Sequence, residues 1–163
     1  RYRELGIPAL QAAFFAEQRL PGERRAILLT RALDGWQDLD QLLHGWQALG
    51  EAQRAAILRA CGELARCLHK AGQMHGCFYP KHIFLRATAS GFEAQLIDLE
   101  KTRPLLFGKR DRVKDLEPLL RRASVWSEAE IRLLLLSYLG NERDVDSWSL
   151  RLGARRRHKE ARR

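Results

Sequence analysis

Two neighbouring stretches decide the fold of this sequence: residues 68–85, LHKAGQMHGCFYPKHIFL, and residues 96–100, LIDLE. Before the first stretch, apolar residues recur at intervals of three and four from Glu51 onward, which predicts a long helix that Gly72 ends. After it, two short apolar runs joined by a glycine-containing turn predict a hairpin. A histidine-rich polar loop therefore lies between a helix and a hairpin, a usual place for binding or catalytic residues.

On both sides of this loop the pattern predicts strands and helices, as in an α+β protein. Asp38 and Ser127 are expected to cap helices, Ser127 in a capping box with Glu130. A wide hairpin loop is expected around Pro21-Gly22. The predicted elements are a helix end at 2–5, strands at 9–17 and 25–33, a turn at 34–36, helices at 39–46 and 51–71, strands at 83–86 and 94–99, an extended stretch at 100–109, and helices at 111–122 and 128–139.

The composition bounds the class of protein. With 163 residues, 45% apolar and 30% charged, the chain can form one packed domain, and repeat arrays, collagen and wholesale disorder are disfavoured. Its longest apolar run, at 133–139, is much shorter than the roughly 20 residues of a membrane span. The first residues are charged and do not form a signal peptide. Because the chain begins with Arg1 and its one methionine is Met74, we expect a piece of a longer protein.

The net charge of +9 is concentrated at one end of the chain. Residues 151–163 carry +6 of it, in a segment expected to be disordered or a frayed helix. The nearly neutral remainder makes a nucleic-acid partner a weak interpretation. The three cysteines, Cys61, Cys67 and Cys77, form no CxxC motif, so we expect neither a disulfide framework nor a zinc ribbon, and a reduced cytoplasmic compartment fits best.

Together the two stretches resemble the catalytic core of the protein-kinase-like fold. A helix ends in Leu-His-x-x-Gly, a loop opens with histidine, a polar residue stands seven positions later, and an Ile-Asp dipeptide ends the next hairpin. Within that fold, HGCFYPKHIFL with LIDLEKTRP is similar to the lipopolysaccharide kinase (Kdo/WaaP) family, most of all its InaA-like branch. The resemblance covers about residues 1–140 and is strongest over 64–104. It implies an N-lobe remnant at 1–33, a helical C-lobe at 34–150 and a basic tail at 151–163.

The resemblance also implies an activity: transfer of the ATP γ-phosphate to a sugar hydroxyl of the lipopolysaccharide core, or to another small or lipid-linked acceptor, at the cytoplasmic face of the inner membrane. His75, Cys77 and Asp98 then occupy the catalytic positions, with His75 as the loop-opening histidine. Asp98 would hold Mg²⁺, a hard ion that prefers oxygen, and His82 would be the second metal residue. Asp115 would brace the loop. The hinge residues that would hold the adenine are Arg31, Ala32 and Leu33.

Two departures from the kinase pattern keep a second function open. The position of the catalytic aspartate holds Cys77, whose thiol has an ordinary pKa near 8.5 and is not a carboxylate base. The sequence also contains neither a glycine-rich phosphate loop nor an identifiable strand lysine with a helix glutamate partner. A pseudokinase, which keeps the scaffold as a nucleotide-binding or regulatory module, is therefore the alternative.

Simpler interpretations stand beside each of these assignments. Asp98 as a turn former, and His75 and His82 as loop histidines held by backbone hydrogen bonds, remain open. A zinc site of His75, Cys77 and His82 lacks a fourth ligand at the usual spacing, and Cys77 as a nucleophile lacks an oxyanion donor. The basic tail has three open interpretations: contact with an anionic membrane, nonspecific nucleic-acid binding, or no partner.

Overall fold

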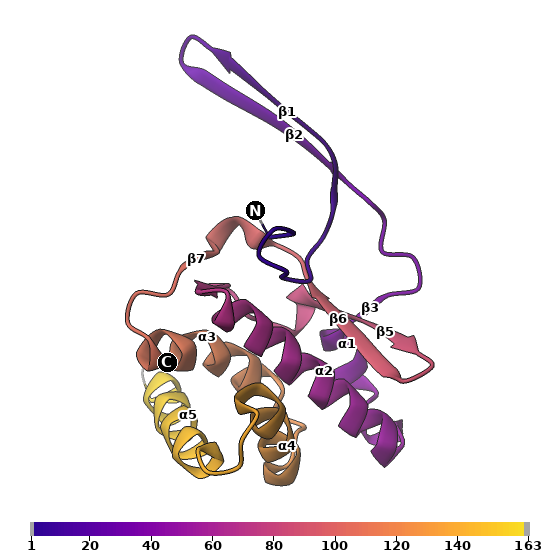
Figure 1. Cartoon of the computed structure of the whole chain (residues 1–163), viewed down its shortest axis with the longest axis vertical. Coiled ribbons are helices and arrows are strands. Elements are labelled where there is room, and N and C mark those ends of the chain that lie inside the picture. Colours follow the sequence, from indigo (N-terminus) through magenta and orange to yellow (C-terminus); the bar gives the residue numbers. More distant parts are fainter. Residues whose placement is uncertain (1, 162–163) are drawn as a thin grey trace.

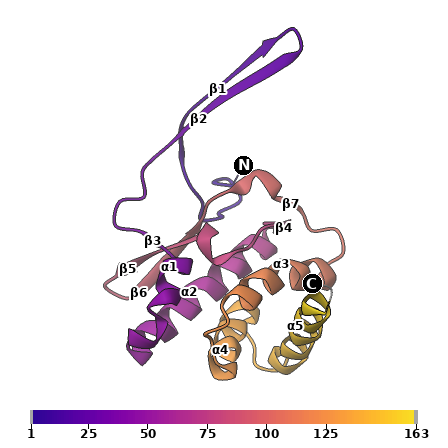
Figure 2. The same ribbon diagram turned by 180° about the vertical axis from the view of Figure 1, so that it is seen from behind.

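The computed structural model describes residues 2–161, except for the side chain of Glu160. It consists of a mainly helical body from which one long β-hairpin projects (Figure 1). The hairpin is formed by β1 (Ala12–Leu20) and β2 (Glu23–Thr30), which pair antiparallel. Seen from behind, the hairpin again lies apart from all the helices (Figure 2). The two strands were predicted, although each begins and ends at different residues than the pattern suggests.

The hairpin differs from the prediction in its turn and its surroundings. Leu20 pairs with Glu23, so the turn has two residues, and the expectation of a wide loop is wrong. Gly22 makes the tight turn possible, because its φ of 77° is readily adopted only by glycine. The helix end expected at 2–5 is also wrong, since these residues form turns that precede the buried Ile7. Large apolar side chains of the hairpin are exposed: Phe14, Phe15, Ile27, Leu28 and Leu29.

A short connection leads from the hairpin into the body. Asp34 and Gly35 form the predicted turn, and the two-residue β3 (Gln37–Asp38) follows. Asp38 caps α1 (Leu39–His44) as expected, because its side chain accepts the N–H of Gln41 at 3.0 Å. A 3-10 turn at Trp46–Ala48 completes this segment, and its Trp46 side chain is buried.

The central helix α2 (Glu51–Lys70) supplies much of the core. The apolar residues that predicted it face inward, and Gly72, with a φ of 71°, lies just beyond its end. Against α2 lies a three-stranded sheet in the order β3-β5-β6, where β5 is Ile83–Thr88 and β6 is Gly91–Leu96. The second of these strands was expected at 94–99. Asp98 cannot continue it, because its φ of 55° is left-handed rather than extended.

The stretch after this sheet is less extended than predicted. Residues Leu99–Lys101 form a 3-10 turn, and only β7 (Arg103–Pro104) is a strand. It pairs antiparallel with β4 (Gln73–Met74), which directly follows α2. This small ladder joins the polar loop that follows α2 to the segment that leads into the last three helices.

The last three helices close the body on the side away from the sheet (Figure 1). They are α3 (Lys109–Arg122), α4 (Glu128–Leu139) and α5 (Val145–Glu160). The capping box of α4 is confirmed: Glu130 N–H donates to Ser127 Oγ, and Ser127 N–H donates to Glu130 Oε2. Most of the basic tail is helical, since α5 continues to Glu160 and buries Leu152. None of the helices in the described part combines the length and apolarity needed to cross a bilayer.

Candidate functional site

The polar loop begins at β4 and ends at a 3-10 turn, Pro80–His82, that leads into β5. Its sharpest bend is at Gly76, whose φ is +80°. A Cβ atom at this position would lie 2.7 Å from the carbonyl oxygen of Lys101, so the loop and the turn before β7 approach too closely for any other residue. Glycine is therefore required at Gly76 for both its conformation and its size.

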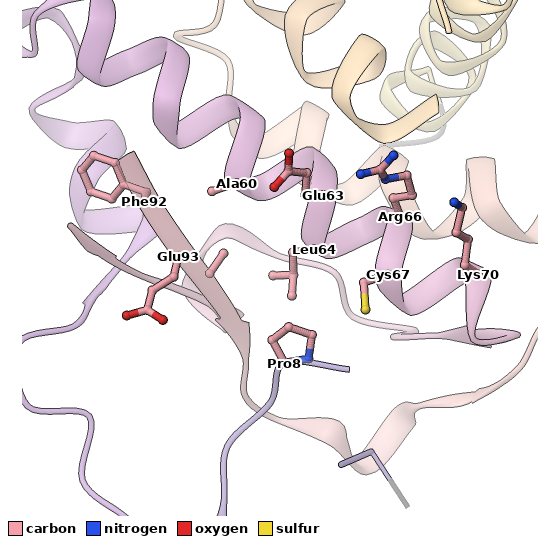
Figure 3. A pocket seen from close by; sticks show the side chains of 10 residues that line it. Pro8, Ala60, Glu63, Leu64, Arg66, Cys67, Lys70, Phe92 and Glu93 are labelled. Carbon is pink, nitrogen blue, oxygen red and sulfur yellow. The ribbon is translucent and has the colours of Figure 1, made fainter. Parts of the chain in front are cut away.

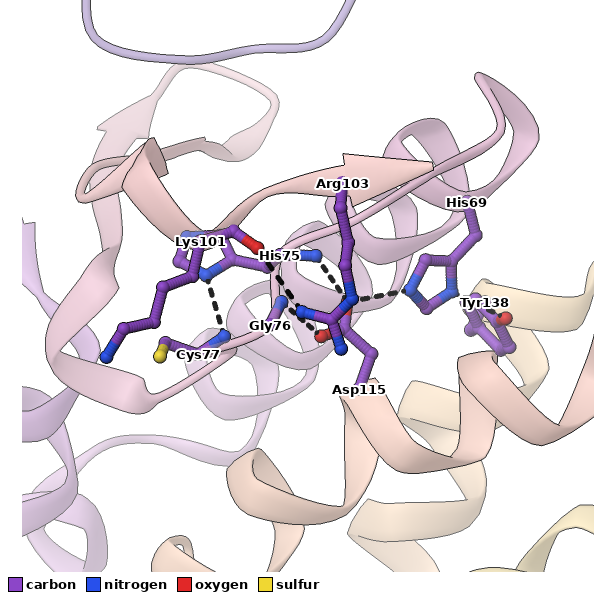
Figure 4. Close-up of polar contacts among 8 residues, drawn as sticks. All are labelled: His69, His75, Gly76, Cys77, Lys101, Arg103, Asp115 and Tyr138. Carbon is purple, nitrogen blue, oxygen red and sulfur yellow. Dashed lines mark hydrogen bonds and ion pairs between the residues drawn. The ribbon is translucent and has the colours of Figure 1, made fainter. Parts of the chain in front are cut away.

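Asp115 on α3 holds this bend in place. Its Oδ2 accepts the His75 N–H and its Oδ1 accepts the Gly76 N–H, each at 2.7 Å (Figure 4). The carboxylate is almost completely buried, so these two charge-assisted hydrogen bonds have little competition from water. The expectation that Asp115 braces the loop through backbone N–H groups is confirmed by this geometry.

Two residues that the sequence analysis did not select extend this network. His69, near the end of α2, contacts Asp115 Oδ2 through Nε2 at 3.0 Å and the hydroxyl of Tyr138 through Nδ1 at 2.8 Å. Burial raises the pKa of Tyr138, so its hydroxyl stays protonated. The loop, α2, α3 and α4 are thus tied together by one chain of buried polar groups. No sequence signal identifies Tyr138, because its contact with His69 joins residues 69 positions apart.

His75 opens the loop and is fully buried beneath it. Its Nε2–H donates to the carbonyl of Ile97 at 2.9 Å, and its Nδ1 accepts the N–H of Cys77 at 3.3 Å. Burial lowers its pKa, which suits the neutral ring that this pair of contacts requires. The imidazole therefore links the loop to the end of β6. This is the structural role that the loop-opening position implies.

Cys77 takes part in the site through its backbone. Its carbonyl accepts from Nδ1 of His82 at 2.8 Å and from the N–H of Tyr79 at 2.7 Å, while its side chain is buried. Because a carbonyl can only accept, Nδ1 of His82 carries the proton, and this fixes the orientation of the ring. The ring of His82 also stacks on that of His75, with centroids 5.6 Å apart.

Asp98 completes the site at its solvent side. Its Oδ2 lies 3.1 Å from Nε2 of His82, and its side chain is 39% exposed whereas that of His82 is buried. Among the described residues it is the one non-glycine residue with a positive φ. Such a conformation costs about 1 kcal/mol or more, and it concentrates at functional positions. The pair offers one carboxylate and one oriented imidazole to a ligand that arrives from solvent.

The structure brings four of the predicted site residues together and places the other three elsewhere. His75, Cys77, His82 and Asp98 form one contact network around the loop. The hinge residues lie where the hairpin joins the body: the Arg31 N–H donates to the Gln11 carbonyl, and the Leu33 carbonyl accepts from Trp36. The assignment of Arg31, Ala32 and Leu33 as an adenine-binding hinge stays a prediction.

A separate hollow of about 540 Å³ lies on the other side of α2, between that helix, β6 and Pro8 (Figure 3). Its charged side chains are of both signs, so their formal charges give no clear preference for an anionic or a cationic ligand. None of the predicted site residues lines this hollow. The loop between β4 and β5 is therefore the better candidate site. The charged residues that line it are Glu63, Arg66, Lys70 and Glu93.

The sequence matches the model of a known protein family. The model of the lipopolysaccharide kinase (Kdo/WaaP) family matches residues 1–138, which include the hairpin, the loop, Asp98 and Asp115. The chain belongs to this family. Protein InaA of Escherichia coli (strain K12) is 29% identical over 109 residues, which are 66% of this chain and 49% of InaA. The chain thus spans about half the length of the curated relative that it matches.

Two solved structures place this Kdo/WaaP family member in the protein-kinase-like fold. WaaP, solved in complex with acyl carrier protein, superposes with a TM-score of 0.81 at 22% identity, over 99% of this chain and 71% of WaaP. The Drosophila melanogaster PAN3 pseudokinase superposes with a TM-score of 0.50 at 17% identity, over 91% of this chain and 50% of PAN3. The predicted α+β, protein-kinase-like fold is confirmed.

Proposed function

We propose that the loop after α2, with Asp98, binds ATP together with Mg²⁺, and that the protein transfers the γ-phosphate to a sugar hydroxyl of the lipopolysaccharide core or a related acceptor. The observation that carries this proposal is the geometry of Asp98. Its carboxylate is exposed in a strained, left-handed conformation, 3.1 Å from the oriented ring of His82. Family membership supports a kinase-like function.

The residues present fit a Mg²⁺ ion. Asp98 supplies the hard oxygen that the ion prefers, and Nε2 of His82 is close enough to Asp98 for both to approach one ion. Imidazole is a poorer ligand for Mg²⁺ than oxygen, so Asp98 would be the stronger of the two. When bound, the ion would neutralise negative charge on the phosphate groups of ATP.

The other loop residues have positioning roles. Asp115 and His75 fix the backbone from Gly76 to Cys77, and the Cys77 carbonyl fixes the ring of His82. The hinge at Arg31–Leu33 would hold the adenine through its backbone. Phosphoryl transfer depends chiefly on positioning and charge neutralisation, so a thiol in place of the usual carboxylate would slow transfer without removing its basis.

The test is calorimetric titration of the protein with ATP, with and without Mg²⁺. Asp98→Asn should weaken Mg²⁺-dependent binding at least about tenfold, because the amide removes the charge that faces the ion. Glu100→Gln is the matched control, since Glu100 is an exposed carboxylate two residues away, and it should bind as the wild type does. A folded wild type that binds no nucleotide would refute the proposal.

A pseudokinase is the second candidate, and Cys77 is the observation that favours it. The buried thiol stands where a carboxylate base is expected, while the bracing by Asp115 is intact. Under this alternative the protein binds nucleotide without turnover. Cys77→Asp distinguishes the two functions: turnover gained only in that variant supports the pseudokinase, whereas turnover in the wild type supports the enzyme. Circular dichroism checks that the variant is folded.

We also propose how the chain divides into kinase lobes and where in the cell the protein acts. The hairpin would be the end of an N-terminal lobe, in which further strands would cover its exposed pairs Phe14–Leu29 and Phe15–Leu28, because an isolated two-stranded hairpin is marginally stable in water. Residues 34–150 would be the C-lobe. A lipid-linked acceptor would place the protein at the cytoplasmic face of the inner membrane, where the basic tail at 151–163 would contact anionic lipids.

A further inference from the structure

The segment between β7 and α3 presents two adjacent large apolar side chains to solvent. Leu106 is 75% exposed and Phe107 is 65% exposed. Leu106 is the most exposed large apolar residue in the described part of the chain. Adjacent exposed apolar side chains form a contiguous apolar patch, the kind of surface that gains from contact with a partner or a membrane.

This turn is held rigidly. The N–H groups of both Leu106 and Phe107 donate to the same oxygen of Asp111, each at 2.9 Å. Just before them, the Leu105 N–H donates to the carbonyl of Gly72 at 2.8 Å. Gly108, with a φ of 48°, then turns the chain into α3. The two apolar side chains are therefore displayed on a fixed backbone.

Cations flank the turn in the sequence. Residues 101–110 include Lys101, Arg103, Lys109 and Arg110 but no acidic residue, and these four cations are exposed. The Arg110 guanidinium lies 5.9 Å from the ring centroid of Phe107, and Lys109 Nζ lies 5.2 Å from that of Trp148. The nearest acidic residue in the following helix, Asp111, is occupied by the two backbone N–H groups. Two exposed apolar side chains next to the exposed cations Lys109 and Arg110 complement an anionic lipid surface.

We propose that Leu106 and Phe107 insert into an anionic lipid bilayer while Lys109 and Arg110, which directly follow the turn, contact its headgroups. Apolar side chains gain from leaving water for the acyl region, and basic residues gain from the negative surface potential. Insertion of two apolar side chains, combined with attraction of basic side chains to the headgroups, gives reversible peripheral binding. The proposed contact uses residues other than those of the basic tail at 151–163, although Lys109 lies over Trp148 of α5, the helix that contains most of the tail.

The turn is connected to the candidate site through one strand pair. β7 lies just before the turn and pairs with β4, and β4 ends directly before His75. Membrane contact at Leu106 and Phe107 would bring the loop close to a lipid-linked acceptor. That consequence rests on the proposed kinase function, whereas binding to the bilayer itself requires no nucleotide.

Vesicle cosedimentation tests the proposal on the whole chain without ATP. Vesicles of phosphatidylcholine with phosphatidylglycerol are compared with phosphatidylcholine alone. The double variant Leu106→Gln/Phe107→Gln should bind the anionic vesicles about tenfold or more weakly, because it removes two inserting side chains. Leu150→Gln on α5 is the matched control, since Leu150 is 73% exposed, and it should bind as the wild type does. Lys109→Gln/Arg110→Gln should weaken binding to the anionic vesicles most at low salt.

Each other outcome overturns the proposal. Wild-type binding by the double variant, or an equal loss in Leu150→Gln, shows that the turn does not insert. A loss confined to Arg155→Gln/Arg157→Gln assigns the contact to the tail. If the double variant keeps vesicle binding but loses self-association in sedimentation equilibrium, the turn joins copies of this chain instead. Because ATP titration is performed without vesicles, failure of membrane binding is distinguishable from failure of the kinase function.

Discussion

Asp115 and Gly76 are 39 residues apart in the sequence, yet the Asp115 carboxylate accepts the Gly76 N–H at 2.7 Å. The second oxygen of the same carboxylate accepts the adjacent N–H of His75. Helix α3 therefore sets the position of the loop, and the loop in turn positions Cys77 and His82. The shape of the site depends on a buried charge outside it.

Replacing Asp115 should destabilise the whole body. Asp115→Asn should lower the free energy of unfolding by about 3 kcal/mol, because an amide nitrogen cannot accept from a backbone N–H and leaves a buried donor unpaired. Urea unfolding followed by tryptophan fluorescence measures the change. Asp34→Asn, at an exposed turn, is the control and should change stability by less than about 0.5 kcal/mol. An equal effect of both substitutions would show that the carboxylate does not anchor the loop.

Gly76→Ala separates crowding from backbone strain. At Gly22, alanine meets only an unfavourable φ of +77°, with no atom within 4 Å of its Cβ. At Gly76 the φ is nearly the same, but Cβ would also lie 2.7 Å from a carbonyl oxygen. Gly22→Ala should therefore cost about 1 kcal/mol, and Gly76→Ala clearly more, in urea unfolding. Similar costs for the two would mean that the Lys101 carbonyl can move aside.

A close approach of two helices gives the next prediction. A Cβ on Gly62 of α2 would lie 2.5 Å from the Leu134 carbonyl and 2.8 Å from Ser137 Cβ on α4. Gly62→Ala should push the helices apart and cost about 2 kcal/mol or more. Gly153→Ala in α5 is the control: its Cβ meets only the end of the flexible Arg157 side chain, so higher helix propensity should stabilise by about 0.5 kcal/mol. Thermal unfolding of the two variants should shift in opposite directions.

The sequence predicted those elements in which apolar spacing and end-of-helix residues point to the same boundaries. The helices α2 and α4 were located to within one residue, because their apolar spacing coincides with a glycine end or a capping box. The predicted bounds of β6 were wrong, because the apolar run continues through Ile97 whereas the backbone becomes left-handed at Asp98. The bracing role of Asp115 came from resemblance. The roles of Tyr138 and His69 could not be predicted, because their contact forms only when α2 and α4 pack together.

Glu130 gives the protein a specific dependence on pH. Burial alone would raise the pKa of this carboxyl, but hydrogen bonds from the Ser127 N–H at 2.8 Å and from Trp46 Nε1–H at 3.0 Å outweigh it, so the pKa lies below its usual value. As pH falls, the Glu130 carboxyl is therefore protonated in the unfolded chain at a higher pH than in the folded protein. The stabilisation is complete above the usual glutamate pKa of about 4.3 and disappears as pH falls through the lower, folded value.

Glu130→Gln should therefore lower the free energy of unfolding by about 1 kcal/mol at neutral pH, since it removes the charge that strengthens both hydrogen bonds. Below the folded pKa the wild-type side chain is itself neutral, so the difference between wild type and variant should vanish there. Urea unfolding at a series of pH values from 7 to about 3 measures this convergence. Glu128→Gln, at an exposed position in the same helical turn, should show a smaller difference throughout. A difference for Glu130→Gln that stays constant with pH would mean that the charge of Glu130 contributes nothing to folding.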